Sequence, residues 1–141
     1  MGAYQEAMAY ALRLLAGRAY SEGRLREKLS ARFPEEAVAE VLERLKAMGY
    51  LDDRAFARAF VDTHRKYGPL KLKALLLARG VPEEVAEEAV GEASLEDALK
   101  VLLRYPHRKD KAKAVRFLLG RGFPLGVALE AYRLAQEEEK G

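Results

Sequence analysis

The sequence predicts an all-α protein made of three copies of a three-helix unit, about nine helices in all. Apolar residues recur at helical spacing along nearly the whole chain, and the helix formers Ala, Leu, Arg and Glu dominate its composition. An Arg followed closely by an apolar residue and a proline recurs at Pro34, Pro82 and Pro124, which are 48 and 42 residues apart. Because these spacings are similar, we interpret each proline as the start of the third helix of one unit.

The first predicted unit covers residues 1–50. Gly17 ends a first amphipathic helix, Ser21 caps a second, and Pro34 opens a third that Gly49 ends. The apolar faces of these helices consist of Ala7, Tyr10, Ala11, Leu14, Leu15, Leu25, Leu29, Val38, Val41, Leu42 and Leu45.

The second predicted unit covers residues 51–92 and repeats this order. Asp52 caps its first helix, Gly68 and Pro69 precede its second, and Pro82 opens its third. Its apolar faces consist of Phe56, Ala59, Phe60, Leu72, Leu75, Leu76, Val85, Ala89 and Val90.

The third predicted unit covers residues 93–141. Ser94 caps its first helix, with Asp97 three residues on, Pro106 ends that helix, and Pro124 leads into the last one. Its apolar positions are Leu95, Leu99, Leu102, Val115, Phe117, Leu118, Val127, Leu129, Ala131, Tyr132 and Leu134. We expect the acidic tail after Gln136 to fray.

The composition argues against catalysis. The chain has no Cys, Trp or Asn, two His, one Thr and three Ser, which leaves few nucleophiles and little imidazole. We therefore predict a protein that is not an enzyme and that needs no metal and no cofactor. No apolar run approaches the ~18–20 residues that span a bilayer, and the N-terminus lacks the pattern of a signal peptide, so we expect a cytoplasmic protein without membrane contact. Unbroken polar faces favour a monomer.

The charges are distributed unevenly, although the formal net charge is only +3. Residues 93–141 carry 10 basic and 7 acidic side chains, whereas residues 51–92 carry 7 and 8. The second helices of these two units are nearly free of acids, and an acidic block separates them. Acidic first turns explain part of that block through the helix dipole. Unmixed basic helices repel themselves, so they favour an anionic partner, either nucleic acid or an acidic protein surface.

A motif at the boundary between the first two units resembles a known family. The stretch Gly49-Tyr50-Leu51-Asp52-Asp53-Arg54-Ala55-Phe56-Ala57 is similar to the signature of RecX, the bacterial regulator of the RecA recombinase. Residues 11–18 and 21–25 resemble the first repeat of that family, and residues 67–72 and 78–82 resemble the second. Residues 94–137 resemble its third repeat more loosely.

The resemblance implies an elongated, curved row of three tandem three-helix units. It also implies a protein that binds in the groove of RecA–DNA filaments and inhibits strand exchange, ATP hydrolysis and the coprotease activity that triggers the SOS response. We expect the basic side chains of the second and third units to face this partner: Arg65, Lys66, Lys71, Lys73, Arg79, Arg104, Arg108, Lys109, Lys111, Lys113, Arg116 and Arg121.

The signature motif has a structural interpretation. Gly49 can adopt the left-handed conformation that ends a helix, and Asp52 can cap the next one. We expect Tyr50 and Leu51 to enter the seam between the first two units, and Phe56 to anchor the face of the following helix. Because adjacent carboxylates at a helix start point in different directions, a metal or acid–base role for Asp52 and Asp53 is disfavoured.

The aromatic and imidazole side chains of the basic stretches leave an alternative open. Tyr67 and Tyr105 stand beside basic residues, where they can stack on bases or on a partner surface. Packing at the core or its rim is the preferred interpretation. We expect His64 at the surface and His107 in a loop.

The alternative function is a sequence-independent DNA-binding protein or a tri-helical transcription regulator. Base readout is poorly supplied, because Asn is absent and Gln occurs only at Gln5 and Gln136, so the usual partners of adenine are missing. Arg can still read guanine. We therefore expect contact with single- or double-stranded DNA to be weak, without sequence preference and steeply dependent on salt.

Overall fold

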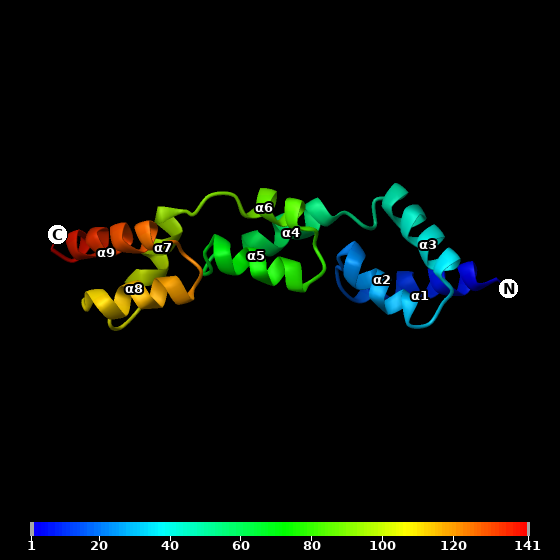
Figure 1. The fold of residues 1–141 in the computed structure, drawn as a ribbon, viewed down its shortest axis with the longest axis horizontal. Coiled ribbons are helices and arrows are strands. Elements are labelled where there is room, and N and C mark those ends of the chain that lie inside the picture. Colours follow the sequence, from blue (N-terminus) through cyan, green and yellow to red (C-terminus); the bar gives the residue numbers. More distant parts are fainter. Residues whose placement is uncertain (1, 141) are drawn as a thin grey trace.

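The structure is a computed structural model that describes residues 2–140 of the chain. Within these residues it contains nine α-helices and no strand, which confirms the predicted fold class. Three three-helix units follow one another in an elongated row, with the two chain ends at opposite ends of the molecule (Figure 1). The helices are α1 (Ala3–Gly17), α2 (Glu22–Ser30), α3 (Glu35–Ala47), α4 (Asp53–Thr63), α5 (Pro69–Ala78), α6 (Glu83–Val90), α7 (Leu95–Leu103), α8 (Lys111–Gly120) and α9 (Leu125–Lys140).

Each unit has a separate apolar core. Leu25, Leu42 and Leu45 are fully buried in the first, Leu76 in the second, and Leu102 and Phe123 in the third. Because each core is small, each unit buries limited apolar surface by itself, and the contacts between units contribute to stability. Within residues 2–140, no helix combines the length and apolar character that crossing a membrane requires.

Side-chain caps start four of the helices. Ser21, Asp52, Ser94 and Asp110 each accept a hydrogen bond from a backbone N–H in the first turn of the helix that follows. Such caps satisfy donors that have no partner inside the helix and typically contribute about 1 kcal/mol each. The predicted roles of Ser21, Asp52 and Ser94 are therefore seen in the structure.

The turn after α3 follows the expected pattern at Gly49 and departs from it at Tyr50. Gly49 has a φ of 81°, in the left-handed region. Leu51 is buried in the core of the first unit, and Phe56 packs at the edge of the core of the second. The expectation that Tyr50 enters the seam is wrong, because its side chain is 58% exposed. The left-handed turn at Gly49 reverses the chain, so Leu51 points inward while Tyr50 points to solvent.

The central helices of the units, α2, α5 and α8, meet end to end (Figure 1). At the junction of units two and three, the N–H groups of Gly68 and Leu70 donate to the carbonyl oxygens of Arg121 and Gly122, at 2.7 and 3.1 Å. Gly68 precedes α5, and Arg121 and Gly122 follow α8. The free donors at the start of one helix therefore bind the free acceptors at the end of the next, and the two helix dipoles align head to tail.

Units one and two are joined in the same sense, but through side chains. Ser21 Oγ donates to the carbonyl oxygen of Arg79 at 2.5 Å, and the Arg24 guanidinium donates to that of Ala78 at 2.7 Å. Glycines allow this approach, since a Cβ on Gly23 would lie 2.6 Å from the carbonyl oxygen of Gly80. The carbonyl end of α5 thus rests on the N-terminus of α2.

Asp53 adds a second tie between these units. Its Oδ1 accepts a hydrogen bond from the backbone N–H of Glu22, the first residue of α2, at 2.9 Å. The two aspartates of the signature therefore have different roles. Asp52 caps its own helix, and Asp53 accepts a hydrogen bond from a helix of the neighbouring unit. Burial raises the pKa of Asp53, and the hydrogen bond from Glu22 opposes that rise.

The C-terminal helix continues through the tail that we expected to fray. α9 extends to Lys140, and Gly141 lies outside the described residues. Ion pairs accompany this extension: Arg108 contacts Glu139, and Arg133 contacts Glu137 at 2.7 Å. The acidic tail therefore contacts cations on the loop between α7 and α8 and on its own helix, and these contacts favour the helical conformation.

The glycine contact at the second junction predicts a steric effect. Gly68 has a φ of −84°, which any residue adopts, but a Cβ there would lie 2.5 Å from the carbonyl oxygen of Gly122. We expect Gly68→Ala to lower the free energy of unfolding by ~1–3 kcal/mol. Gly120→Ala is the control, because no atom lies within 4 Å of its Cβ position, and it should leave stability unchanged or raise it by up to about 1 kcal/mol. Urea unfolding followed by circular dichroism measures the free energy of unfolding of both variants. If Gly68→Ala and Gly120→Ala change it equally, the close contact between Gly68 and Gly122 is not present in solution.

The contact of Asp53 predicts a difference between two substitutions. Asp53→Ala removes the acceptor of the Glu22 N–H and should lower the free energy of unfolding by about 1 kcal/mol. Asp53→Asn keeps an acceptor oxygen and removes the buried charge, so it should be tolerated better.

The difference in stability between the wild-type protein and Asp53→Asn should depend on pH. The folded-state pKa of Asp53 is raised, so its charge costs stability above that pKa, and this cost disappears as pH falls toward the ordinary aspartate value. The wild-type protein should therefore gain stability relative to Asp53→Asn over that interval. Urea unfolding at a series of pH values tests this, and a loss relative to Asp53→Asn would show that the charged form is favoured.

Candidate functional site

A groove of about 750 Å³ lies at the junction of the second and third units, and we call it the junction groove. α7 and the loop after it supply most of its wall, the turn between α4 and α5 supplies one edge, and α8 with its C-terminal end supplies the rest. Its lining residues are Arg65, Lys66, Asp97, Lys100, Val101, Leu103, Arg104, Tyr105, Pro106, Phe117 and Arg121. The size is within the range of ligand-binding clefts.

Cations dominate the lining of the junction groove, which has five of them and one carboxylate. Among residues 2–140, no carboxylate lies within 4.0 Å of Lys66, Arg104 or Arg121. Lys100 contacts Glu96 at 3.2 Å, but both side chains are largely exposed, and such surface pairs contribute little. The groove therefore has a positive potential that its own residues do not cancel.

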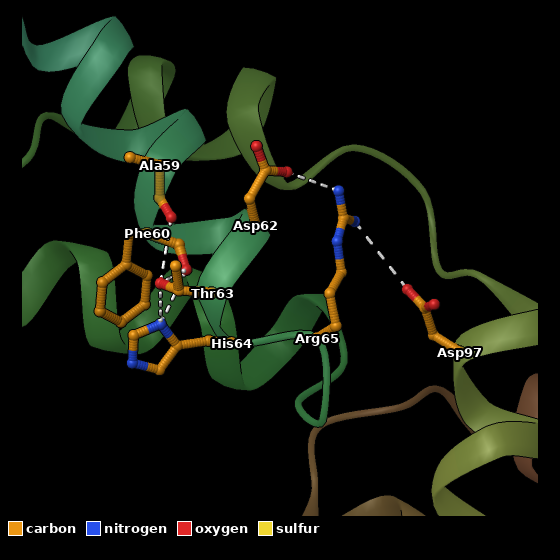
Figure 2. A network of polar contacts seen from close by, with 7 residues as sticks. All are labelled: Ala59, Phe60, Asp62, Thr63, His64, Arg65 and Asp97. Atoms are coloured by element: carbon orange, nitrogen blue, oxygen red, sulfur yellow. Dashed lines mark hydrogen bonds and ion pairs between the residues drawn. The ribbon is translucent and has the colours of Figure 1, made fainter.

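Arg65 connects the two units across the edge of the groove (Figure 2). Its guanidinium donates to Asp62 at 2.7 Å and lies 3.9 Å from Asp97, near the start of α7. The preceding residue, His64, stacks on Phe60 with ring centroids 3.9 Å apart, and its Nδ1 lies 2.7 Å from the carbonyl oxygen of Phe60. These contacts fix the end of α4 and hold Arg65 at the junction. His64 is thus half-buried, with a structural role in the turn.

Three cations contact the ring of Tyr67. The charged groups of Lys71, Lys66 and Arg121 lie 4.6, 5.2 and 5.9 Å from its centroid. Arg121 also lies 5.0 Å from the ring of Phe117. The negative faces of aromatic rings attract cations, so these rings offset part of the repulsion between like charges. Aromatic residues therefore allow the dense positive charge at this junction.

The floor of the groove is apolar. Tyr105 and Phe117 stack with centroids 4.1 Å apart and an angle of 4° between their planes. Val101, Leu103 and Pro106 complete this surface. One face of Tyr105 is covered by Phe117, and the Arg121 guanidinium lies over the Phe117 ring. Tyr67 and Tyr105 both pack against the edges of cores, which agrees with the preferred interpretation of these residues.

The structure brings only some of the predicted partner-facing residues together. Arg65, Lys66, Arg104 and Arg121 line the groove, and Lys71 lies beside it on Tyr67. Lys111, Lys113 and Arg116 are exposed on α8 outside the groove. Arg79 lies 4.7 Å from the ring of Phe60 and lines a smaller pocket between the first two units.

Besides Arg65, three of the predicted cations have acidic partners within the chain. Lys73 contacts Glu83 and Glu87 of α6, at 3.1 and 2.7 Å. The hydrogen bond to Glu87 raises the pKa of Lys73 and lowers that of Glu87. Arg108 and Lys109 both contact Glu139. These acids lie 10 to 31 residues away in sequence, so charge counts in a short window missed them.

Seven lining residues were absent from the predicted surface: Asp97, Lys100, Val101, Leu103, Tyr105, Pro106 and Phe117. Lys100 and Arg104 are four residues apart, so they lie on the same side of α7 and of the turn after it. This spacing was a usable signal. The apolar residues had no such signal, because their spacing is that of an ordinary core face.

The outer face of α5 is apolar. Leu70 is 64% exposed and Leu77 is 41% exposed, and Ala74 lies between them at helical spacing. We call these three residues the α5 stripe. The core face of α5 carries the buried Leu72 and Leu76, so the helix is apolar on two sides, with Lys71 and Lys73 between them. Within the described residues, this face of α5 is covered by no other element.

Comparison with known proteins gives consistent matches. Residues 7–45 match the family model described as RecX, first three-helix domain, and residues 52–90 match RecX, second three-helix domain. The chain is similar to the regulatory protein RecX of Thermus thermophilus, at 70% identity over 96% of each chain. It is 35% identical to that of Chlorobaculum tepidum, over 98% of this chain and 93% of the relative.

A solved structure extends the likeness to the third unit. The crystal structure of RecX from Lactobacillus salivarius superposes with a TM-score of 0.86, covering 95% of this chain and 97% of that one. At 19% identity this match concerns the fold. It includes the region beyond residue 90 that neither family model matches. Among residues 2–140, no group of three or more His, Asp or Glu side chains is arranged to hold a metal ion.

The contacts of Arg121 predict that it stabilises the junction. Arg121→Gln removes the cation from the rings of Tyr67 and Phe117, and we expect the free energy of unfolding to fall by ~1 kcal/mol. Arg116→Gln is the matched control on the exposed side of the same helix and should change it by less than about 0.5 kcal/mol. Urea unfolding compares the two, and an equal loss would show that the rings do not hold Arg121.

Proposed function

The chain belongs to the RecX family of regulatory proteins, and from that premise we propose that it binds RecA–DNA filaments and inhibits RecA. The proposed effects cover the recombinase, ATPase and coprotease activities of RecA in DNA repair and the SOS response. The observation that carries this proposal is the junction groove, where an apolar floor lies beside three cations that have no carboxylate partner in the part of the chain that the structure describes.

The shape of the protein suits a filament. A filament presents the same features at regular intervals along its groove, and this chain has three similar units in one row (Figure 1). Several modest contacts then act together, because each one raises the effective concentration of the next. The end-to-end junctions hold the units in fixed positions relative to one another, so the protein loses less conformational freedom when it binds.

The α5 stripe favours a protein partner over bare DNA. Leu70 and Leu77 lie exposed at the centre of the row, where a DNA-binding helix would present cations to phosphates. Exposed apolar residues beside cations are typical of protein interfaces. A protein that acts on RecA belongs in the cytoplasm, and we propose that it acts as a monomer.

Weak binding to DNA is the second candidate function. The observation that favours it is the exposed basic side of α8, with Lys111, Lys113 and Arg116. Among residues 2–140 these side chains have no acidic partner within 4.0 Å, so they can contact phosphates. We expect such binding to lack sequence preference, whether the chain acts as a general DNA-binding protein or as a tri-helical transcription regulator.

The proposal predicts inhibition of RecA at low concentration. RecA on single-stranded DNA is titrated with the protein while ATP hydrolysis is followed, and the affinity of the protein for naked DNA is measured in parallel. We expect inhibition at concentrations at least about tenfold below those that bind naked DNA, since several contacts act together. Inhibition that only follows the occupancy of naked DNA would instead support the second candidate function.

Charge reversal on α8 tests the exposed basic side separately. We expect Lys111→Glu with Lys113→Glu to weaken inhibition while leaving the helical content intact, because both side chains are exposed. The control is Lys28→Glu with Arg44→Glu, which makes the same change in net charge on exposed positions of the first unit. If the two double variants inhibit equally, the α8 surface takes no part in the contact with the partner.

A further inference from the structure

We propose that the junction groove binds an acidic segment of a protein partner, and that one apolar side chain of this segment anchors on the groove floor. The inference deepens the proposed function and rests on it only in taking the regulated partner to be a protein. Three properties of the groove carry it: three cations without a carboxylate partner among residues 2–140, aromatic rings that are partly covered, and an open apolar floor.

The cations set the charge of the occupant. Lys66, Arg104 and Arg121 have no carboxylate partner among the described residues, and they come from a turn of the second unit and two positions of the third. A ligand that touches all three therefore crosses the junction. Since these charges repel one another, an anionic occupant gains from each of them.

Arg65 shows that the groove accepts a carboxylate. It hydrogen-bonds Asp62 at 2.7 Å, but its contact with Asp97 is an ion pair at 3.9 Å (Figure 2). Asp97 thus already places one carboxylate at the edge of the groove without hydrogen-bonding the guanidinium. A carboxylate of a partner can approach Arg65 more closely and form the planar, bidentate contact that Arg favours.

The aromatic residues argue against nucleic acid as the occupant. Proteins that bind single strands present free aromatic faces on which bases stack. Here Tyr105 and Phe117 use a face of each ring for one another, and Arg121 lies over Phe117. The rest of the Tyr105 ring and the half-buried Val101 and Leu103 line the floor, a surface suited to an aliphatic or aromatic side chain of a peptide.

The groove has the anatomy of a peptide site as a whole. An apolar floor inside a ring of cations fits an apolar anchor flanked by Asp or Glu, with the anchor giving affinity and the charges giving orientation. Its volume of about 750 Å³ holds several side chains but not a folded domain. The occupant is therefore a short segment, and the rest of the partner lies outside the groove.

The test measures binding of three labelled probes to the full chain by fluorescence anisotropy. The first is a short peptide rich in Asp and Glu with a central Leu-Phe pair, the second is the same peptide with Ser-Gly in place of that pair, and the third is an oligothymidylate. Lys100→Glu with Arg104→Glu reverses two lining cations. Lys28→Glu with Arg44→Glu is the matched control, and circular dichroism verifies that each variant is folded.

We expect the first peptide to bind the wild-type protein and the control variant equally. Its dissociation constant should rise about tenfold or more in the Lys100→Glu and Arg104→Glu variant, and by about tenfold to a hundredfold when Ser-Gly replaces the anchor. The proposal would be overturned if the oligothymidylate bound more tightly than the peptide and depended on the same two cations. It would also be overturned if the first peptide did not bind, or if its binding were unchanged by the double substitution or by the loss of the anchor.

Self-association is the remaining alternative, in which a second copy of the chain fills the groove. Sedimentation velocity tests it, and a dimer that Lys100→Glu with Arg104→Glu abolishes would overturn the proposal. The ATP hydrolysis titration with RecA is independent of these probes. If the wild-type protein inhibits RecA while the peptide fails to bind, the proposed function stands and this inference alone is wrong.

Discussion

The organisation of this protein depends on hydrogen bonds between the ends of its central helices. The carbonyl groups of the two residues that follow α8 accept from the N–H groups of Gly68 and Leu70, and carbonyl groups at the end of α5 accept from the side chains of Ser21 and Arg24. Helix ends carry polar groups without internal partners, so joining two ends satisfies both sets at once. Because each unit has a small core of its own, these junctions turn three separate cores into one row.

The junction groove is a consequence of the same contact. Arg121 offers its carbonyl oxygen to Gly68 and its side chain to the rings of Tyr67 and Phe117, so one residue both joins the units and adds a cation to the groove. Arg65 also joins the two units, through its ion pair with Asp97. The charge that we assign to binding is thus held in place by the bonds that hold the fold.

The sequence predicted the local features and missed those that depend on distant partners. Helix starts at Ser21 and Asp52 and the turn at Gly49 were predictable, because each depends on neighbours within a few residues. The acids that neutralise Lys73 come from another helix, and the groove combines residues from two units, so neither could be read from spacing. The Arg that recurs before Pro82 and Pro124 is followed by a glycine at both places, and the structure shows that Gly80 and Gly122 allow close contact between units.

Amide hydrogen exchange at Gly68 and Leu70 tests the end-to-end junction most directly. Amides at a helix start ordinarily exchange fast because they have no partner. Ala112, in the first turn of α8, is the internal reference, since no acceptor is found for its N–H among the described residues. Our account predicts that Gly68 and Leu70 exchange far more slowly than Ala112. Exchange of all three at the same rate would show that the units do not stay stacked in solution, and would contradict it.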